Sequence, residues 1–112
     1  MTIHQRGIVH DVECDVACVG RFYDFLEKRD GRWGLVLRQP IYEFDRLDPV
    51  NPASTVHLDA AILGRYPSGY RHLAYLQVQA GFDPKRDMPV VTGPALDALY
   101  SKGARWLENK PL

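Results

Sequence analysis

The sequence has few cysteines, no long apolar run and no excess of charge of either sign. Among 112 residues there are two cysteines, and 14 basic residues balance 14 acidic ones. Because no basic run is present, we do not expect the chain to bind nucleic acid or a membrane surface through its charge. No stretch approaches the ~20 apolar residues of a membrane helix, and the N-terminus lacks the apolar core of a signal peptide, so the expected location is the cytoplasm.

Several chemical signatures are absent as well. There is no GxGxxG, GxxxxGK[ST], HExxH or GxSxG pattern, so nucleotide-dependent and nucleophile-elbow chemistry lose their usual support. Cys14 and Cys18 lie four residues apart on one predicted strand, which separates them by roughly 13 Å, too far for a disulfide. We expect small buried thiols rather than a metal or redox pair, and we expect no metal and no cofactor.

The first half of the chain has the composition of β-strands. Asp30-Gly31 favours a two-residue hairpin turn, Glu13-Cys14 is the predicted polar turn before it, and Pro40 is expected to break or bulge the last strand. The result is an antiparallel meander over residues 2–47. The predicted strands, rich in Val, Ile, Phe and Tyr, are 2–12, 15–29 and 32–47.

The second half changes to a helical period. Gly81 should end the middle helix, and Pro94 suits the first position of the last one. Strands followed by helices indicate a single α+β domain over residues 1–112, with the helical part at 56–110. The predicted helices are 56–66, 69–81 and 93–110, and the apolar stripe of the last one comprises Leu96, Leu99, Tyr100, Gly103 and Leu107, flanked by Trp106.

The two predicted turns fix which residues face one another across the sheet. They place His4, Tyr23 and Arg38 in one row, with Arg6 and Arg21 in the next row on the same face. An imidazole, a phenol and a guanidinium could polarise a carbonyl or stabilise an enolate. The alternative is that all five are half-exposed sheet residues without a catalytic role.

Three other histidines have simpler explanations. His10 lies near Asp11 and Glu13 without a compact metal geometry, and His57 precedes Asp59, which suits a helix cap. His72 begins the predicted middle helix, where it lines a pocket only if its side of the helix faces a cavity; otherwise the helix is a packing element.

Three segments resemble SnoaL-like proteins of the nuclear transport factor 2-like superfamily. They are "RDGRWGLVLRQPIYEFDRLDPV", "YPSGYRHLAYLQVQAG" and "DMPVVTGPALDALYSKGARWLEN". The resemblance implies a curved antiparallel sheet wrapped around helices as a cone with an apolar pocket. It also implies either a cofactor-free enzyme that uses an Asp and a His, or a non-catalytic binding or dimerisation module. Fold alone does not decide between these.

The chain departs from that family at its start, where relatives have a block of helices and a strand that carries the catalytic Asp. A sheet without that block should expose an apolar face, and self-association, as a dimer or a larger homo-oligomer, would cover it. We therefore expect a non-catalytic domain that dimerises or binds a small apolar or aromatic ligand. The alternative is a cofactor-free lyase or isomerase acting on an aromatic, polyketide or steroid-like substrate, with His4 as the proton-transfer group and Tyr23 and Arg38 beside it.

Overall fold

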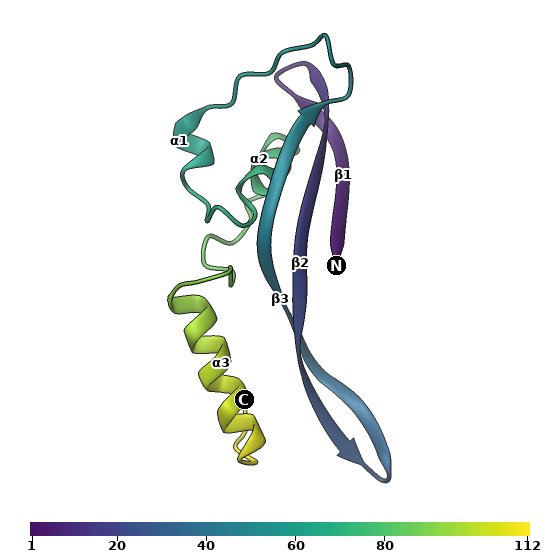
Figure 1. Cartoon of the computed structure of the whole chain (residues 1–112), viewed down its shortest axis with the longest axis vertical. Helices are drawn as coiled ribbons and strands as arrows, with labels where there is room; N and C mark the ends of the chain where they lie inside the picture. The colour runs from purple at the N-terminus through teal and green to yellow at the C-terminus, as the bar shows by residue number, and fades with distance from the viewer.

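The computed structural model describes residues 1–112 and has the expected α+β composition, an antiparallel sheet followed by helices (Figure 1). The three strands lie in chain order, β1-β2-β3. No helix is long and apolar enough to span a membrane. The elements are β1 (Thr2–Val9), β2 (Val12–Arg29), β3 (Arg32–Pro49), α1 (Ala60–Leu63), α2 (Arg71–Gln79) and α3 (Pro94–Leu107).

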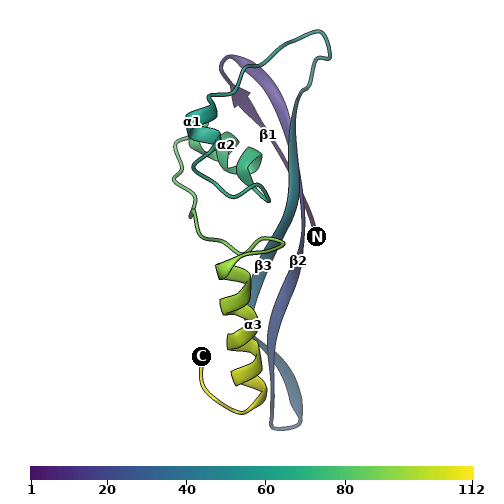
Figure 2. The same cartoon turned by 60° about the vertical axis from the view of Figure 1, so that its left-hand side comes forward.

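Unequal strand lengths divide the molecule into two regions. β2 and β3 have 18 residues each and β1 has 8, so the sheet has three strands at one end and two at the other. The proximal region, residues 1–20 and 42–93, contains β1, α1 and α2. The distal region, residues 21–41 and 94–112, is a two-stranded arm with α3 beside it. Both views show all three helices on the same side of the sheet (Figures 1 and 2).

The first hairpin turn is not where the sequence analysis placed it. The chain reverses at His10 and Asp11, which both have positive φ, 47° and 65°, and not at Glu13-Cys14. His and Asp tolerate this conformation less well than Gly, so the turn has a weak sequence signal. The side chain of Tyr75 supports it, because its hydroxyl lies 2.6 Å from His10 Nε2. As a result His4 pairs with Ala17, six residues away from its predicted partner Tyr23.

The second hairpin turn is confirmed at Asp30-Gly31, and its register follows the prediction as far as Leu26 opposite Leu35. Two extra residues in β3, Val36 and Glu43, then shift the pairing. Each β-bulge moves the following residues of β3 by one position relative to β2. The bulges were not predicted, and they are the second reason why the expected row of side chains does not form.

Pro40 lies within a continuous β3, so the predicted break at this residue is wrong. It faces Phe22. Gly20 exchanges backbone hydrogen bonds with Met1, which lies on the edge of β2 away from β3. Successive backbone amides of a strand point alternately to its two edges. Phe22 therefore also directs its amide away from β3, and a proline opposite it removes no hydrogen bond from the ladder.

The helices agree with the sequence pattern more closely than the sheet does. Pro94 is the first residue of α3 after Gly93, and Gly81, with φ of 93°, follows the end of α2. Asp59 caps α1, as its position suggested, although α1 is only four residues long. Tyr100 and Leu107 are the exceptions in the α3 stripe, because they are 38% and 84% exposed.

Two separate apolar clusters hold the helices to the sheet. The proximal cluster has ten buried residues, including Cys14 and Cys18, which are free thiols as expected. The distal cluster has four buried residues, Phe25, Ile41, Leu96 and Leu99. In β2 the even-numbered residues Cys14, Val16 and Cys18 enter the proximal cluster, whereas the odd-numbered Phe25 enters the distal one. β2 has no extra residue that would change the alternation of its side chains between these positions. The two clusters therefore use opposite faces of the β2-β3 ribbon, and its twist turns both toward the helices.

Candidate functional site

His4 lies on the outer side of the sheet, which we define as the side away from the helices. It borders a shallow depression of about 450 Å³ between two ion pairs, Arg6–Asp15 and Arg46–Asp48. Arg6 donates two hydrogen bonds to Asp15, at 2.7 and 2.9 Å, and these lower the pKa of the Asp15 carboxyl. This neighbourhood is polar and open to solvent, so it holds no apolar substrate.

Tyr23 lies on the helix-bearing side, in contact with α3. A Cβ added at Gly103 would lie 2.0 Å from the Tyr23 hydroxyl oxygen, so the glycine provides the space that the ring occupies. The Tyr23 ring also contacts Tyr100 and Phe25, with centroid distances of 5.3 and 5.5 Å. These contacts make Tyr23 a packing residue between the arm and α3.

The two other predicted arginines are also engaged in local contacts. Arg38 faces Asp24 and donates two hydrogen bonds of 2.9 Å to its carboxylate, and its guanidinium lies 4.3 Å from the centroid of the Phe22 ring. Arg21 points toward α3, where it donates a 2.7 Å hydrogen bond to the Tyr100 hydroxyl. The predicted convergence of His4, Tyr23 and Arg38 is therefore wrong: His4 and Arg38 leave the sheet far apart on its outer side, and Tyr23 leaves it toward α3.

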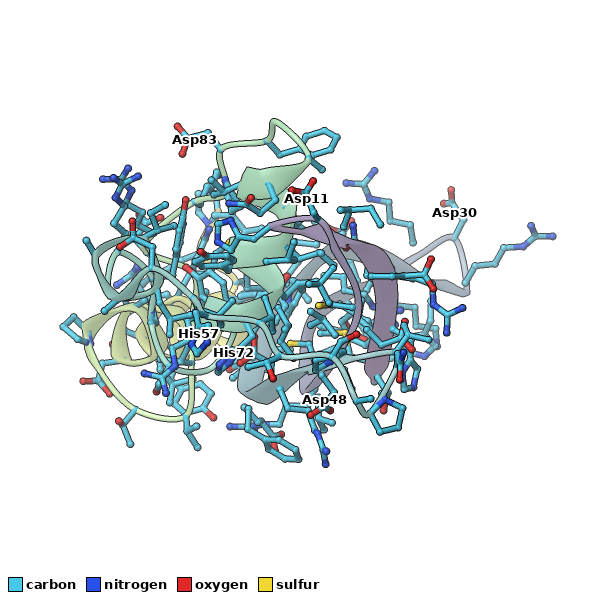
Figure 3. All side chains as sticks on the ribbon, turned by 90° about the horizontal axis from the view of Figure 1, so that it is seen from above. Asp11, Asp30, Asp48, His57, His72 and Asp83 are labelled. Carbon is cyan, nitrogen blue, oxygen red and sulfur yellow. The ribbon has the colours of Figure 1, made fainter.

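His72 has the carboxylate partner that the sequence analysis sought for His4. Its Nδ1 lies 2.8 Å from Asp45 Oδ1, and the other oxygen of Asp45 accepts a 2.8 Å hydrogen bond from the backbone N–H of Leu73. The Asp45 side chain is fully buried, whereas 21% of the His72 side chain is exposed. Figure 3 shows His72 within the packed body of the molecule, while Asp30 and Asp83 project from its periphery.

This arrangement suits proton transfer at one atom. A carboxylate bound to Nδ1 fixes the orientation of the imidazole and leaves Nε2 as the group that can accept or donate a proton. The same carboxylate caps the first turn of α2, so Asp45 also has a structural role. Asp45 was not predicted as a site residue because its inward direction depends on the bulge at Glu43. The available signal was its alternation with Leu47, which also points inward.

An apolar cavity of about 190 Å³ lies near α2. Tyr70 borders it and pins the loop beyond α2 by donating a 2.7 Å hydrogen bond to the Lys85 carbonyl and accepting one from the Met88 N–H at 3.2 Å. Burial raises the pKa values of Tyr42 and Tyr70, so both phenols stay neutral near pH 7. His72 is not among the residues that line this cavity. The cavity is lined by Tyr42, Tyr70, Leu73, Ala74, Gln77, Pro84, Lys85 and Met88.

No group of three or more His, Cys, Asp or Glu side chains is placed to hold a metal ion. The two thiols are too deeply buried to serve as nucleophiles. Burial raises the pKa of Cys18 to about 11, and it raises the pKa of Cys14 as well, so both stay protonated near neutral pH.

Comparison with known proteins finds fungal relatives. The chain is 40% identical over 119 aligned positions to pea pathogenicity protein 2 of Fusarium vanettenii, and 40% identical over 118 positions to a PEP2-like protein of the same fungus. An uncharacterized protein of Emericella nidulans is 34% identical over 124 positions. Each alignment covers at least 98% of this chain but only 51–52% of the relative.

The chain thus spans about half the length of the curated relatives it matches. No family model matches the sequence.

Proposed function

We propose that this chain is a non-catalytic association domain of the SnoaL-like type, which pairs with a second copy of itself. The observation that carries the proposal is the elongated arm and the apolar side chains exposed on it. The α+β fold, with its helices on one side of the sheet, is compatible with part of a nuclear transport factor 2-like cone. A cytoplasmic location and the absence of a cofactor belong to the same proposal.

The shape of the molecule supports association. Its radius of gyration is 17.2 Å and its extents are 56 × 28 × 21 Å, whereas a compact domain of this length has a radius of gyration of about 13 Å. Only 18 of the 112 residues are buried. A chain of this size that buries so few residues gains much of its stability from surfaces covered by a partner.

The arm carries the apolar surface that most needs covering. Phe22, Leu26 and Leu35 are 42–51% exposed, and Trp33 near the tip is 70% exposed. Leu26 and Trp33 also line an open depression of about 510 Å³ that reaches the end of α3. Cross-strand pairing places them together, with Phe22 opposite Pro40, Leu26 opposite Leu35 and Lys28 opposite Trp33. The Asp24–Arg38 ion pair lies between Phe22 and Leu26 on this face, so the surface is mixed. Exposed apolar side chains that gather in one place mark an interaction site. We infer that its occupant is another copy of this chain.

Light scattering at micromolar concentration tests the proposal. The wild-type chain should have twice the monomer mass, and Leu26→Ser with Leu35→Ser should lower the mass toward that of a monomer. A matched control is Phe82→Ser with Val91→Ser, which removes two residues of similar exposure, 67% and 54%, outside the strands. A monomeric wild-type chain, or equal loss of mass in both double variants, would contradict the proposal.

The Asp45–His72 pair favours one second candidate, the cofactor-free lyase or isomerase. In this form His72 Nε2 would transfer the proton and Asp45 would orient the imidazole ring. His72→Asn keeps a polar group near Nδ1 and removes Nε2, and His57→Asn is a matched control at an exposed histidine. Turnover of aromatic ketone substrates that falls at least 100-fold only in His72→Asn would support catalysis; equal turnover in both variants would exclude His72.

A further inference from the structure

One face of α2 lines the apolar cavity of about 190 Å³ in the proximal region. Tyr70, the N-cap residue of α2, lines it together with Leu73, Ala74 and Gln77. Residues spaced three and four apart share one face of a helix. Tyr70, Leu73 and Ala74 are at most 5% exposed, so the cavity borders the core of the proximal region.

The segment that joins α2 to α3, residues 80–93, forms another wall of the cavity (Figure 2). The Tyr70 hydroxyl fixes this segment by its hydrogen bonds to the Lys85 carbonyl and the Met88 N–H. The backbone N–H of Tyr42 donates a 3.0 Å hydrogen bond to another carbonyl of the same segment. The wall is therefore in place before a ligand enters, which lowers the entropic cost of binding.

The size and lining of the cavity suit a single aromatic ring. A cavity of about 150 Å³ with apolar walls accepts benzene, so one of about 190 Å³ has room for a ring with a small substituent. The rings of Tyr42 and Tyr70 lie with their centroids 4.9 Å apart and form an aromatic wall. Leu73 and the thioether of Met88 complete an apolar lining that favours contact with a flat ring.

Two polar side chains at the cavity are free to bind a substituent of that ring. No hydrogen bond within the chain uses the hydroxyl of the half-buried Tyr42. The Gln77 carboxamide makes one contact, 3.5 Å from its Nε2 to Gln5 Oε1, which is longer than an ordinary hydrogen bond.

The cavity disfavours a charged ligand. Burial raises the pKa values of Tyr42 and Tyr70, and the same desolvation opposes the entry of an ion. Lys85 is the one charged residue among those that line the cavity, and it is exposed, so solvent and salt screen its ammonium group.

We propose that this cavity binds a neutral molecule with one aromatic ring and one hydroxyl or carbonyl group, and that Tyr42 or Gln77 binds this group. The ligand enters from a wider depression of about 540 Å³ beside the start of α3, since Lys85 and Met88 line both. The site uses neither the apolar side chains of the arm nor the Asp45–His72 pair. It is therefore independent of the proposed self-association.

Three probes that share one ring test the class of ligand: phenol is neutral and polar, toluene is apolar, and benzoate is charged. The chain contains two methionines, of which Met88 lines the cavity and Met1 does not. In spectra of the full chain labelled with ¹³C at the methionine methyl groups, phenol should shift the Met88 resonance more than that of Met1. Calorimetric titration should show phenol binding roughly tenfold or more tightly than benzoate, because the carboxylate must lose its water.

A cavity-filling variant tests the location of the site. Ala74→Leu occupies part of the cavity and should weaken the binding of phenol and toluene roughly tenfold or more, which corresponds to about 1.4 kcal/mol. Ala104→Leu makes the same change at an exposed position of α3 and should leave both affinities unchanged. Circular dichroism of each variant confirms that it is folded.

A second variant keeps the size of the cavity and removes its free polar groups. With Tyr42→Phe and Gln77→Met together, phenol should bind no more tightly than toluene, while toluene keeps its affinity. Equal shifts of the two methionine methyls, or unchanged phenol binding in a folded Ala74→Leu variant, would overturn the site. Benzoate that binds as tightly as phenol, or phenol binding that survives the loss of both polar groups, would overturn the proposed class of ligand.

Discussion

The proximal and distal regions share the same two strands but differ in how those strands are covered. In the proximal region β1 completes a third strand, and ten buried residues join the sheet to α2. In the distal region two strands and one helix share four buried residues. An isolated two-stranded ribbon is only marginally stable in water. From this comparison we expect the proximal region to carry most of the stability of the chain and the distal arm to open more easily.

The strongest test of this difference is the same truncation in both clusters. Leu76, which is 2% exposed, packs in the proximal cluster, and Leu99, which is 7% exposed, packs in the distal one. Leu76→Ala should lower the free energy of unfolding by about 3 kcal/mol. Leu99→Ala should release α3 from the arm with a smaller effect on the rest of the molecule. Urea unfolding and hydrogen exchange of α2 and α3 amides measure the two responses.

If either substitution lowered the hydrogen-exchange protection of α2 and α3 amides equally, the two regions would unfold as one unit. Release of α3 alone by Leu99→Ala would show that the arm opens independently.

A second test acts only on the distal region, through the contact between Gly103 and Tyr23. Gly103→Ala would place a methyl group 2.0 Å from the Tyr23 hydroxyl oxygen, and the overpacking should lower the free energy of unfolding by about 2 kcal/mol. Adding Tyr23→Phe removes that oxygen and should recover part of the loss, although ring carbons 2.8 Å away remain. Thermal unfolding of the single and double variants gives the comparison. Additive losses would show that the two residues do not meet.

The proximal region should be the more sensitive of the two to alkali. The folded pKa of Cys18 is raised to about 11 by burial, above the ordinary value of about 8.5. The unfolded thiol therefore loses its proton first, so stability is complete below about pH 8.5 and falls as the pH rises toward 11. The loss should reach about 3 kcal/mol in the wild type, because each pKa unit corresponds to about 1.4 kcal/mol. Cys18→Ala should flatten this part of the profile in urea unfolding at a series of pH values.

An unchanged slope in Cys18→Ala would assign the alkaline loss to other groups. Cys14, Tyr42 and Tyr70 are the candidates, because burial raises their pKa values too.

The two regions also differ in how well the sequence predicts them. In the distal region Asp30-Gly31 marks its turn, and Gly93-Pro94 marks the start of α3, because these residues have strong local preferences. In the proximal region the turn at His10 and Asp11 is stabilised by Tyr75, 65 residues away from His10. Such a contact has no local signature, so the register of β1 and the position of His4 could not be predicted.

The candidate site was missed for the same kind of reason. His72 was recognised as a candidate, but its partner Asp45 lies 27 residues earlier on a strand whose facing direction is set by the bulge at Glu43. A single extra residue reverses which side chains point inward. The sequence therefore indicated the residue types of an Asp–His pair without showing which two residues meet.

The smallest expected effect concerns α1, the least buried helix of the proximal region. Asp59 caps it by accepting a 2.9 Å hydrogen bond from the Ala61 N–H, while its own N–H donates to the Tyr75 hydroxyl. Asp59→Ala removes only the cap and should lower the free energy of unfolding by about 0.5–1 kcal/mol. Tyr75→Phe removes the hydroxyl that joins α1 to the His10 turn and should cost more, since it leaves both the Asp59 N–H and His10 Nε2 without this partner. If urea unfolding gave a larger loss for Asp59→Ala than for Tyr75→Phe, the cap rather than the tyrosine would anchor α1, and the proximal region would depend on its surface more than on its core.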